Sequence, residues 1–173
     1  YSQKREDNMA IHKVDGVDGV NNFPKKFVTL HALAAITKGE IVAIETDTTV
    51  TDYAKNGLGA SVIKSTGTSG DEGLVLGVAA ETITAAGDLK IQTAGKFVDA
   101  IVVDGVTRGE ILVPSSVTAG ALAPIEVAFD DTFNRDDLKF ARVAVALESE
   151  GTGGTESGTA LKADIMIIDQ GYF

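Results

Sequence analysis

The sequence of 173 residues contains no cysteine and no tryptophan, and only two histidines and three tyrosines. Without cysteine there are no disulfides, no thiolate metal ligands and no cysteine nucleophiles. Histidine, the side chain most often used as a general base near neutral pH and as a metal ligand, is scarce. The shortage of large aromatic rings disfavours sugar-binding clefts and base-stacking platforms. Few classes of reactive site remain.

Basic residues are also in short supply, because Lys and Arg number 15 against 25 Asp and Glu, giving a net charge of −10. A chain with this balance gains little from releasing counterions from a phosphate backbone. It is also repelled by anionic membrane surfaces. No apolar run reaches the roughly 18 residues that a transmembrane helix needs. We therefore expect neither nucleic acid nor a membrane as a partner.

What the sequence does contain is a series of short apolar, β-branched runs separated by turn signals, with 19 glycines among 173 residues. This pattern predicts an all-β fold, a barrel or sandwich of about nine or ten short strands. The runs fall at 27–30, 41–45, 74–81, 89–93, 97–103, 111–113, 125–129, 141–147 and 165–168.

Three local features sharpen this prediction. Gly77 lies in the middle of an apolar run, which is typical of a bulge or of a close approach by another backbone. Lys90 and Gln92 alternate with apolar residues, which predicts a half-buried strand with these two on its polar face. The continuous apolar run at 165–168 predicts a strand buried on both faces, and 31–36 is the one segment expected to form a turn or two of helix.

The first 26 residues differ from the rest and predict an extended N-terminal arm, followed by a β-barrel-like domain over 27–173. Apolar residues recur there at every third position, but two Asp-Gly pairs disfavour a helix. These apolar residues are candidate anchors for a partner, with packing on the chain's own domain as the alternative. They are Ile11, Val14, Val17, Val20 and Phe23.

A weak internal repeat runs through the β region. The segment Lys38-Gly39-Glu40-Ile41 resembles Arg108-Gly109-Glu110-Ile111, and VAAET at 78–82 resembles VALES at 145–149 at a nearly equal distance downstream. We interpret this as one β unit used twice, over 27–104 and 105–173. The alternative is that a basic residue, Gly and Glu form a common turn at the start of a strand. The Gly/Ser/Thr-rich segment 151–159 is expected to be a flexible hairpin tip.

No catalytic or metal-binding pattern emerges. His12 and His31 have no carboxylate at ligand spacing, and the acidic residues have no calcium-loop spacing. The acidic residues are expected to be solvated, with a carboxylate-based hydrolase as the alternative. They are Asp15, Asp18, Asp130, Asp131, Asp136 and Asp137. We expect no enzyme activity, no cofactor and no metal.

The order of these glycine and apolar positions resembles a family of known proteins. The segment FVTLHALAAITKGEIVAI at 27–44, the segment LGVAAE at 76–81 and the stretch AGDLKIQTAGKF at 86–97 are similar to the capsid decoration, or cement, proteins of tailed bacteriophages. Gly109-Glu110, Ile125–Asp130 and Arg142–Glu148 resemble the second portion of that pattern. The resemblance covers about residues 27–170 and includes no catalytic motif.

The resemblance implies a structural protein on the outer surface of a phage head, where it bridges neighbouring major capsid subunits and stabilises the shell. It implies the major capsid protein as partner, and self-association as a trimer or dimer. An alternative is another structural β-domain of the virion, in the tail, the baseplate or an adhesin.

Overall fold

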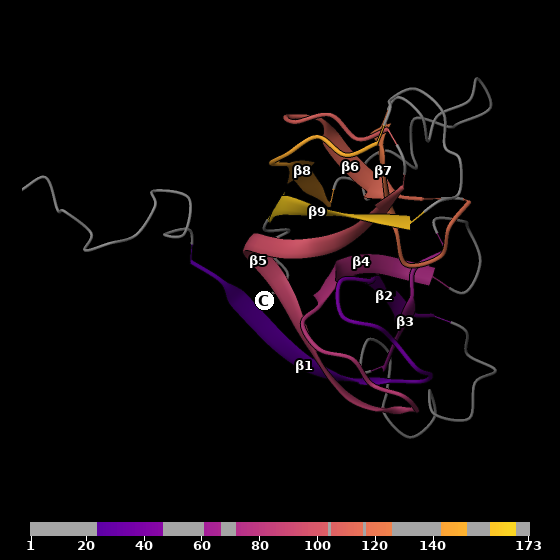
Figure 1. Ribbon diagram of the computed structural model, residues 1–173. Helices are drawn as coiled ribbons and strands as arrows, with labels where there is room; N and C mark the ends of the chain where they lie inside the picture. The colour runs from indigo at the N-terminus through magenta and orange to yellow at the C-terminus, as the bar shows by residue number, and fades with distance from the viewer. Residues whose placement is uncertain are drawn as a thin grey trace, which may run out of the picture.

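The computed structural model describes residues 24–46, 61–66, 72–103, 105–115, 117–125, 143–151 and 160–168. Within them the fold is all-β, as predicted, with nine strands in a single mixed sheet (Figure 1). The strands are β1 (Lys26–Ala32), β2 (Ile41–Glu45), β3 (Ser61–Lys64), β4 (Glu72–Ala79), β5 (Gly87–Val103), β6 (Ile111–Pro114), β7 (Leu122–Pro124), β8 (Ala144–Ala146) and β9 (Ala160–Ile167). No helix among these residues has the length and hydrophobicity of a transmembrane span.

The sheet closes on itself twice, and the 17-residue strand β5 belongs to both closures. The first ring runs β1-β3-β2-β4-β5 and is closed by pairing of β1 with β5. The second ring runs β5-β7-β6-β8-β9 and is closed by pairing of β9 with β5. In Figure 1 the first ring lies below and the second above, with β5 passing between them. Closure pairs the edges of these short strands, which removes most of the exposed sheet edge.

The two rings repeat the same scheme of pairing. In the first, β1 and β3 are parallel, while the pairs β2–β3, β2–β4, β4–β5 and β1–β5 are antiparallel. In the second, β5 and β7 are parallel, while β6–β7, β6–β8, β8–β9 and β5–β9 are antiparallel. The C-terminal half of β5 therefore corresponds to β1, and β6 to β9 correspond to β2, β3, β4 and the N-terminal half of β5. The weak sequence repeat reflects a repeated fold.

The two units meet inside β5. Residues 87–94 of β5 pair with β1 and β4, whereas residues 95–103 pair with β7 and β9. From the sequence repeat we placed the boundary after residue 104 and expected separate strands at 89–93 and 97–103, whereas the structure has one strand, β5, that runs through Gly95. One uninterrupted strand thus belongs to both units, and no linker separates them along this path.

Strands β2 and β4 are buried on both faces because the second ring packs against the first. Ile41, Ala43, Val75 and Val78 belong to the same apolar cluster as Leu112, Leu122, Ile165 and other residues of the second ring. Their neighbours along the same strands, Val42, Leu76 and Ala79, belong to the core of the first ring. This double burial explains why β2 and β4 read as continuous apolar runs without polar alternation.

Several local predictions are corrected by these strands. The segment 31–36 is not helical, because β1 continues to Ala32 and Ile36 forms an isolated antiparallel bridge with Ile83. The last strand is not buried on both faces: in β9, buried Ile165 and Ile167 alternate with half-buried Met166. Strand β3 was not predicted. The predicted strand at 125–129 and the predicted tip at 151–159 lie mostly outside the described residues.

Gly77 confirms the prediction of close backbone approach. A Cβ atom on Gly77 would lie 2.1 Å from the carbonyl oxygen of Gln92 and 3.1 Å from the Cα of Thr93 on the neighbouring strand β5. The pairing of β2 with β4 also shifts register between Val42 and Ala43. Only glycine allows β4 and β5 to come this close.

Candidate functional site: the junction of the two units

Two equivalent turns, Thr37–Glu40 and Thr107–Glu110, lead into β2 and β6. In the first, the Thr37 N–H donates to Oε2 of Glu40 at 2.7 Å, and the Glu40 N–H donates to the Thr37 carbonyl at 3.1 Å. In the second, the same two bonds join Thr107 and Glu110 at 2.6 Å and 3.1 Å. Glycine follows the basic residue in both because φ is +93° at Gly39 and +90° at Gly109, a conformation that side chains disfavour.

The repeat extends to the strands that these turns touch. The Gly39 N–H donates to the Ala79 carbonyl, and the Gly109 N–H to the Ala146 carbonyl, both at 2.9 Å. The Lys38 N–H donates to Oγ1 of Thr82 at 2.9 Å. In the second unit the Arg108 N–H donates to Oγ of Ser149 at 3.0 Å. The second half of the sequence repeat, VAAET and VALES, thus provides the partners of the first half.

The surroundings of the two turns are different. The Gly39 carbonyl accepts a hydrogen bond from the Ile101 N–H of β5 at 2.9 Å, and a Cβ on Gly39 would lie 2.7 Å from the Asp99 carbonyl oxygen. A Cβ on Gly109 would meet nothing within 4 Å. The first turn is therefore docked against the second unit, whereas among the described residues nothing lies against Gly109 in this way.

More main-chain bonds fix this junction. The Ile41 N–H donates to the Gly120 carbonyl at 2.9 Å, and the Gly120 N–H donates to the Ser65 carbonyl at 2.6 Å. Gly120 has φ +77°, and a Cβ there would lie 3.0 Å from Cγ of Lys64 and 3.1 Å from Cβ of Glu40. The β6–β7 loop of the second unit is thus wedged against β2 and β3 of the first.

Glu40 connects the turn to the junction. Besides accepting from Thr37, it forms an ion pair with Lys64, with 2.7 Å between Oε1 and Nζ, and its side chain is only 10% exposed. Its counterpart Glu110 caps its own turn on a more exposed surface. The same glutamate therefore has a second role in the first unit.

We expect Glu40→Ala to lower the free energy of unfolding by about 2–3 kcal/mol, because it removes a charge-assisted hydrogen bond and leaves Lys64 without its carboxylate. The matched variant Glu110→Ala loses the turn bond alone, which costs about 1 kcal/mol. Urea denaturation of both variants measures the difference. Equal losses would show that the ion pair contributes nothing to the junction.

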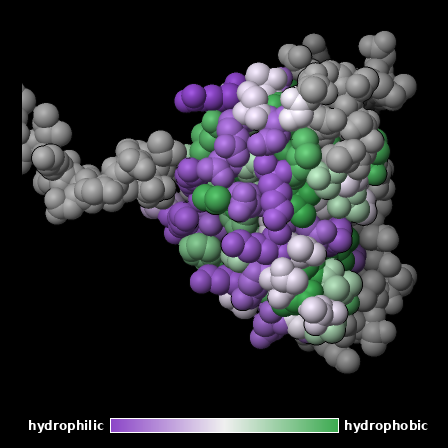
Figure 2. All heavy atoms as spheres, viewed as in Figure 1, coloured by the Kyte–Doolittle hydropathy of each residue, from purple (hydrophilic) through white to green (hydrophobic). Residues whose placement is uncertain are grey.

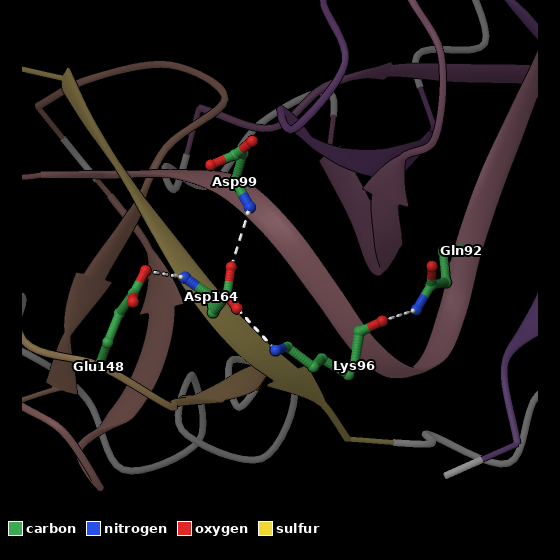
Figure 3. A network of polar contacts seen from close by, with 5 residues as sticks. All are labelled: Gln92, Lys96, Asp99, Glu148 and Asp164. Atoms are coloured by element: carbon green, nitrogen blue, oxygen red, sulfur yellow. Dashed lines mark hydrogen bonds and ion pairs between the residues drawn. The ribbon is translucent and has the colours of Figure 1, made fainter. Parts of the chain in front are cut away.

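A bulge in β5 adjoins the docked turn and carries a polar network (Figure 3). The register of β5 against β9 shifts between Phe97 and Ala100, and Asp99 has φ +61°. Asp164 of β9 pairs with Lys96 at 2.7 Å between Oδ2 and Nζ and accepts a 3.4 Å hydrogen bond from the Asp99 N–H. The Asp164 N–H in turn donates to Oε1 of Glu148 at 2.7 Å. This network holds the bulge in place, and the Asp99 carbonyl within the bulge packs against Gly39.

Gln92 supports the change of direction within β5. Its side-chain Nε2 donates to the carbonyls of Ala94 and Lys96, at 3.0 and 2.9 Å, around Gly95 with φ +89°. Gln92 is only 3% exposed, so the prediction that it lies on a polar face was wrong. The alternation of polar and apolar residues at 89–93 predicts only which face of the strand a side chain occupies. It gave no sign that the Gln92 side chain is buried and donates to backbone carbonyls.

The described surface offers small apolar areas. Phe27 of β1 is 45% exposed, with the Lys90 ammonium 4.5 Å from its ring centroid, and Val98 and Val117 are 49% and 62% exposed. On the face in Figure 2, hydrophilic side chains extend across the middle and hydrophobic ones form separate patches. Any partner that binds this face meets mixed polar and apolar contacts.

The residues singled out as candidate sites are placed as follows. The arm anchors, His12 and all six clustered aspartates lie outside the described residues. His31 lies opposite Asp88 of β5, with 3.7 Å between its Nδ1 and Oδ1 of Asp88. No group of three or more potential metal ligands occurs within the described ranges.

Comparison of the chain with protein-family models and with curated proteins finds no match. A hypothesis about its function therefore rests on its own residues and geometry. The most extensive set of contacts among those residues is the junction, where the two rings of strands, each a barrel-like unit, pack against each other and share β5.

Proposed function

We propose that this chain is a structural protein of a tailed-phage virion, a capsid decoration protein that binds the outside of the head and bridges neighbouring major capsid subunits. The observation that carries the proposal is the junction: two barrels share β5, a common apolar cluster and the docked Gly39 turn. A bridge between subunits that are pushed apart must keep a fixed length. Two barrels without a linker along β5 meet that requirement.

Binding of such a protein would stabilise the shell through the thermodynamic linkage between binding and shell assembly. A protein that binds the intact lattice better than separated subunits shifts the equilibrium toward the intact lattice by its differential binding free energy. No bond-making group is needed for this role, and many weak contacts suffice when subunits repeat, because neighbouring contacts raise the effective concentration. The scarcity of histidine and the absence of cysteine agree with such a role.

The arm provides the proposed contact with the shell. Five apolar residues, Ile11, Val14, Val17, Val20 and Phe23, are spaced at every third position ahead of β1. An extended segment of this kind binds through main-chain hydrogen bonds and pockets for its apolar side chains. The major capsid protein is the partner that we propose for it.

The test uses empty heads assembled from the major capsid protein that we propose as the partner. We expect the purified chain to bind them saturably and to raise the temperature at which they disassemble. A full-length variant with the five arm anchors changed to serine should lose at least about tenfold in affinity, equivalent to about 1.4 kcal/mol. The control changes Lys13 and Asn21 to serine and should bind normally.

Location on the virion distinguishes the rival. Gold-labelled antibody against the chain should mark the head surface in electron micrographs. Label on the tail or baseplate, or heads that bind neither form of the chain, would contradict the proposal and favour another virion component.

A further inference from the structure

Phe27, the second residue of β1, is the one aromatic side chain among the large hydrophobic residues exposed in the described part of the chain. It is 45% exposed, and the other two such residues, Val98 and Val117, are smaller. The Lys90 ammonium lies 4.5 Å from the centroid of the Phe27 ring, so a cation and an apolar surface reach solvent together. An exposed ring costs free energy in water, and aromatic side chains are enriched at protein interfaces.

The pairing of β1 with β5 places Phe27 on a face of the sheet that is in contact with solvent (Figure 1). Phe27 lies opposite Gln92, and Thr29 lies opposite Lys90. Because side chains alternate along a strand, Phe27, Thr29 and Lys90 share one face. All three are exposed, whereas Val28 between them packs against the core of the first ring. The ring therefore lies on the outside of the first unit.

The same end of this ladder carries positive charge. Lys25 is exposed, and its Cα and Cγ atoms would each lie 3.3 Å from a Cβ on Gly95, three residues beyond Gln92 on β5. No Asp or Glu occurs in the segment 24–39. We call Lys25, Phe27 and Lys90 the Phe27 patch. It is a locally basic, apolar-centred surface on a chain whose net charge is −10.

Two carboxylates border the patch, and both contact other groups. Oδ1 of Asp88 lies 3.7 Å from Nδ1 of His31, farther along the ladder from Phe27. Oε1 of Glu81 accepts a hydrogen bond from the main-chain N–H of Lys90 at 2.9 Å. Within the described ranges, no carboxylate forms an ion pair with the ammonium groups of the Phe27 patch. These charges are therefore available to a partner.

The complement of the Phe27 patch is an acidic surface with an apolar pocket. An acidic partner is repelled by the chain as a whole and attracted at this patch, so charge decides which side of the chain is presented to it. The patch is also continuous with the arm, because Phe27 follows the last arm anchor, Phe23, by four residues. A partner that binds the arm thus reaches the patch without crossing another part of the chain.

We infer that the Phe27 patch is where the β domain itself contacts the shell. The Phe27 ring enters an apolar pocket of the major capsid protein, and Lys25 and Lys90 pair with carboxylates at the rim of that pocket. This inference rests on the proposed function and adds to it the chemistry of the partner surface. The arm and the start of β1 then form one continuous interface.

Two full-length variants separate the apolar and the charged parts of the patch. Phe27→Ser removes the ring, and the double variant Lys25→Gln with Lys90→Gln removes the two charges. Val117→Ser is the matched control for the ring, since Val117 is 62% exposed. The control for charge lowers the net charge by the same amount at exposed positions elsewhere, Lys38→Gln with Lys162→Gln. Circular dichroism and thermal melting check that each variant is folded.

The measurement is co-sedimentation of each variant with the empty heads, at about 50 mM and about 300 mM salt, between which the screening length shortens more than twofold. We expect Phe27→Ser to weaken binding at least about tenfold at both salt concentrations, because burial of an apolar ring is not screened. The double lysine variant should weaken binding at least about tenfold at the lower salt concentration and much less at the higher one. Both controls should bind like the wild type.

If the wild type binds heads and both patch variants bind equally well, the inference is wrong while the proposed function stands. A loss that the charge control shares would also overturn it, because net charge and not the patch would then be responsible. If the wild type itself fails to bind heads, the proposed function and this inference fall together. The two failures are thus told apart by the wild-type chain in the same experiment.

Discussion

Gly77→Ala is expected to lower the free energy of unfolding by about 3 kcal/mol or more, at the upper end of what overpacking costs. The added Cβ would lie 2.1 Å from the Gln92 carbonyl oxygen and 3.0 Å from its carbonyl carbon. These are backbone atoms, so no side-chain rotation relieves the clash. Strand β4 would have to move away from β5, although β4 is buried between the two apolar clusters.

Chemical denaturation measures this effect, and Gly87→Ala is the matched control. Gly87 lies at the start of β5, where an added Cβ meets nothing within 4 Å. Alanine there should change stability by no more than about 0.5 kcal/mol, or stabilise slightly by restricting the unfolded chain. Similar losses for the two variants would mean that β4 and β5 are not as close as the structure places them.

Gly77 also shows how far the sequence could predict this fold. A glycine inside an apolar run indicated close backbone approach, and the periodicity of the runs predicted an all-β chain, because both signals arise from local geometry. The K/R-G-E-I repeat predicted a repeated unit for the same reason: the turn and its bonds to Thr82 or Ser149 need the same residues each time.

What the sequence could not predict depends on how the two units pack. Strand β3, with only four residues, lacks a long apolar run. Gln92 alternates like a surface residue but turns inward to hold the carbonyls beside Gly95. The continuity of β5 was not predicted, because Gly95 separates two apolar runs in the sequence and so indicates a break between strands. The junction follows from packing between elements that are distant in sequence.

Substitutions at the two glycines of the repeated turn separate the effect of packing between the units from the effect of local backbone strain. Gly39 and Gly109 have nearly equal φ, +93° and +90°, so alanine pays a similar backbone strain at either position, about 1–2 kcal/mol. Only at Gly39 does the new Cβ also meet the Asp99 carbonyl, at 2.7 Å. We therefore expect Gly39→Ala to destabilise the fold by about 2 kcal/mol more than Gly109→Ala.

Unfolding by denaturant at low chain concentration, where association contributes nothing, gives this difference. Amide hydrogen exchange adds a local readout, because the Ile101 N–H is bonded to the Gly39 carbonyl. Its exchange should accelerate in Gly39→Ala beyond the change expected from global stability, and should follow global stability in Gly109→Ala. Equal losses with no selective effect at Ile101 would mean that the Gly39 turn does not help to hold the two units together. The fixed spacing on which the bridging role depends would then rest on β5, the Gly120 loop and the shared apolar cluster.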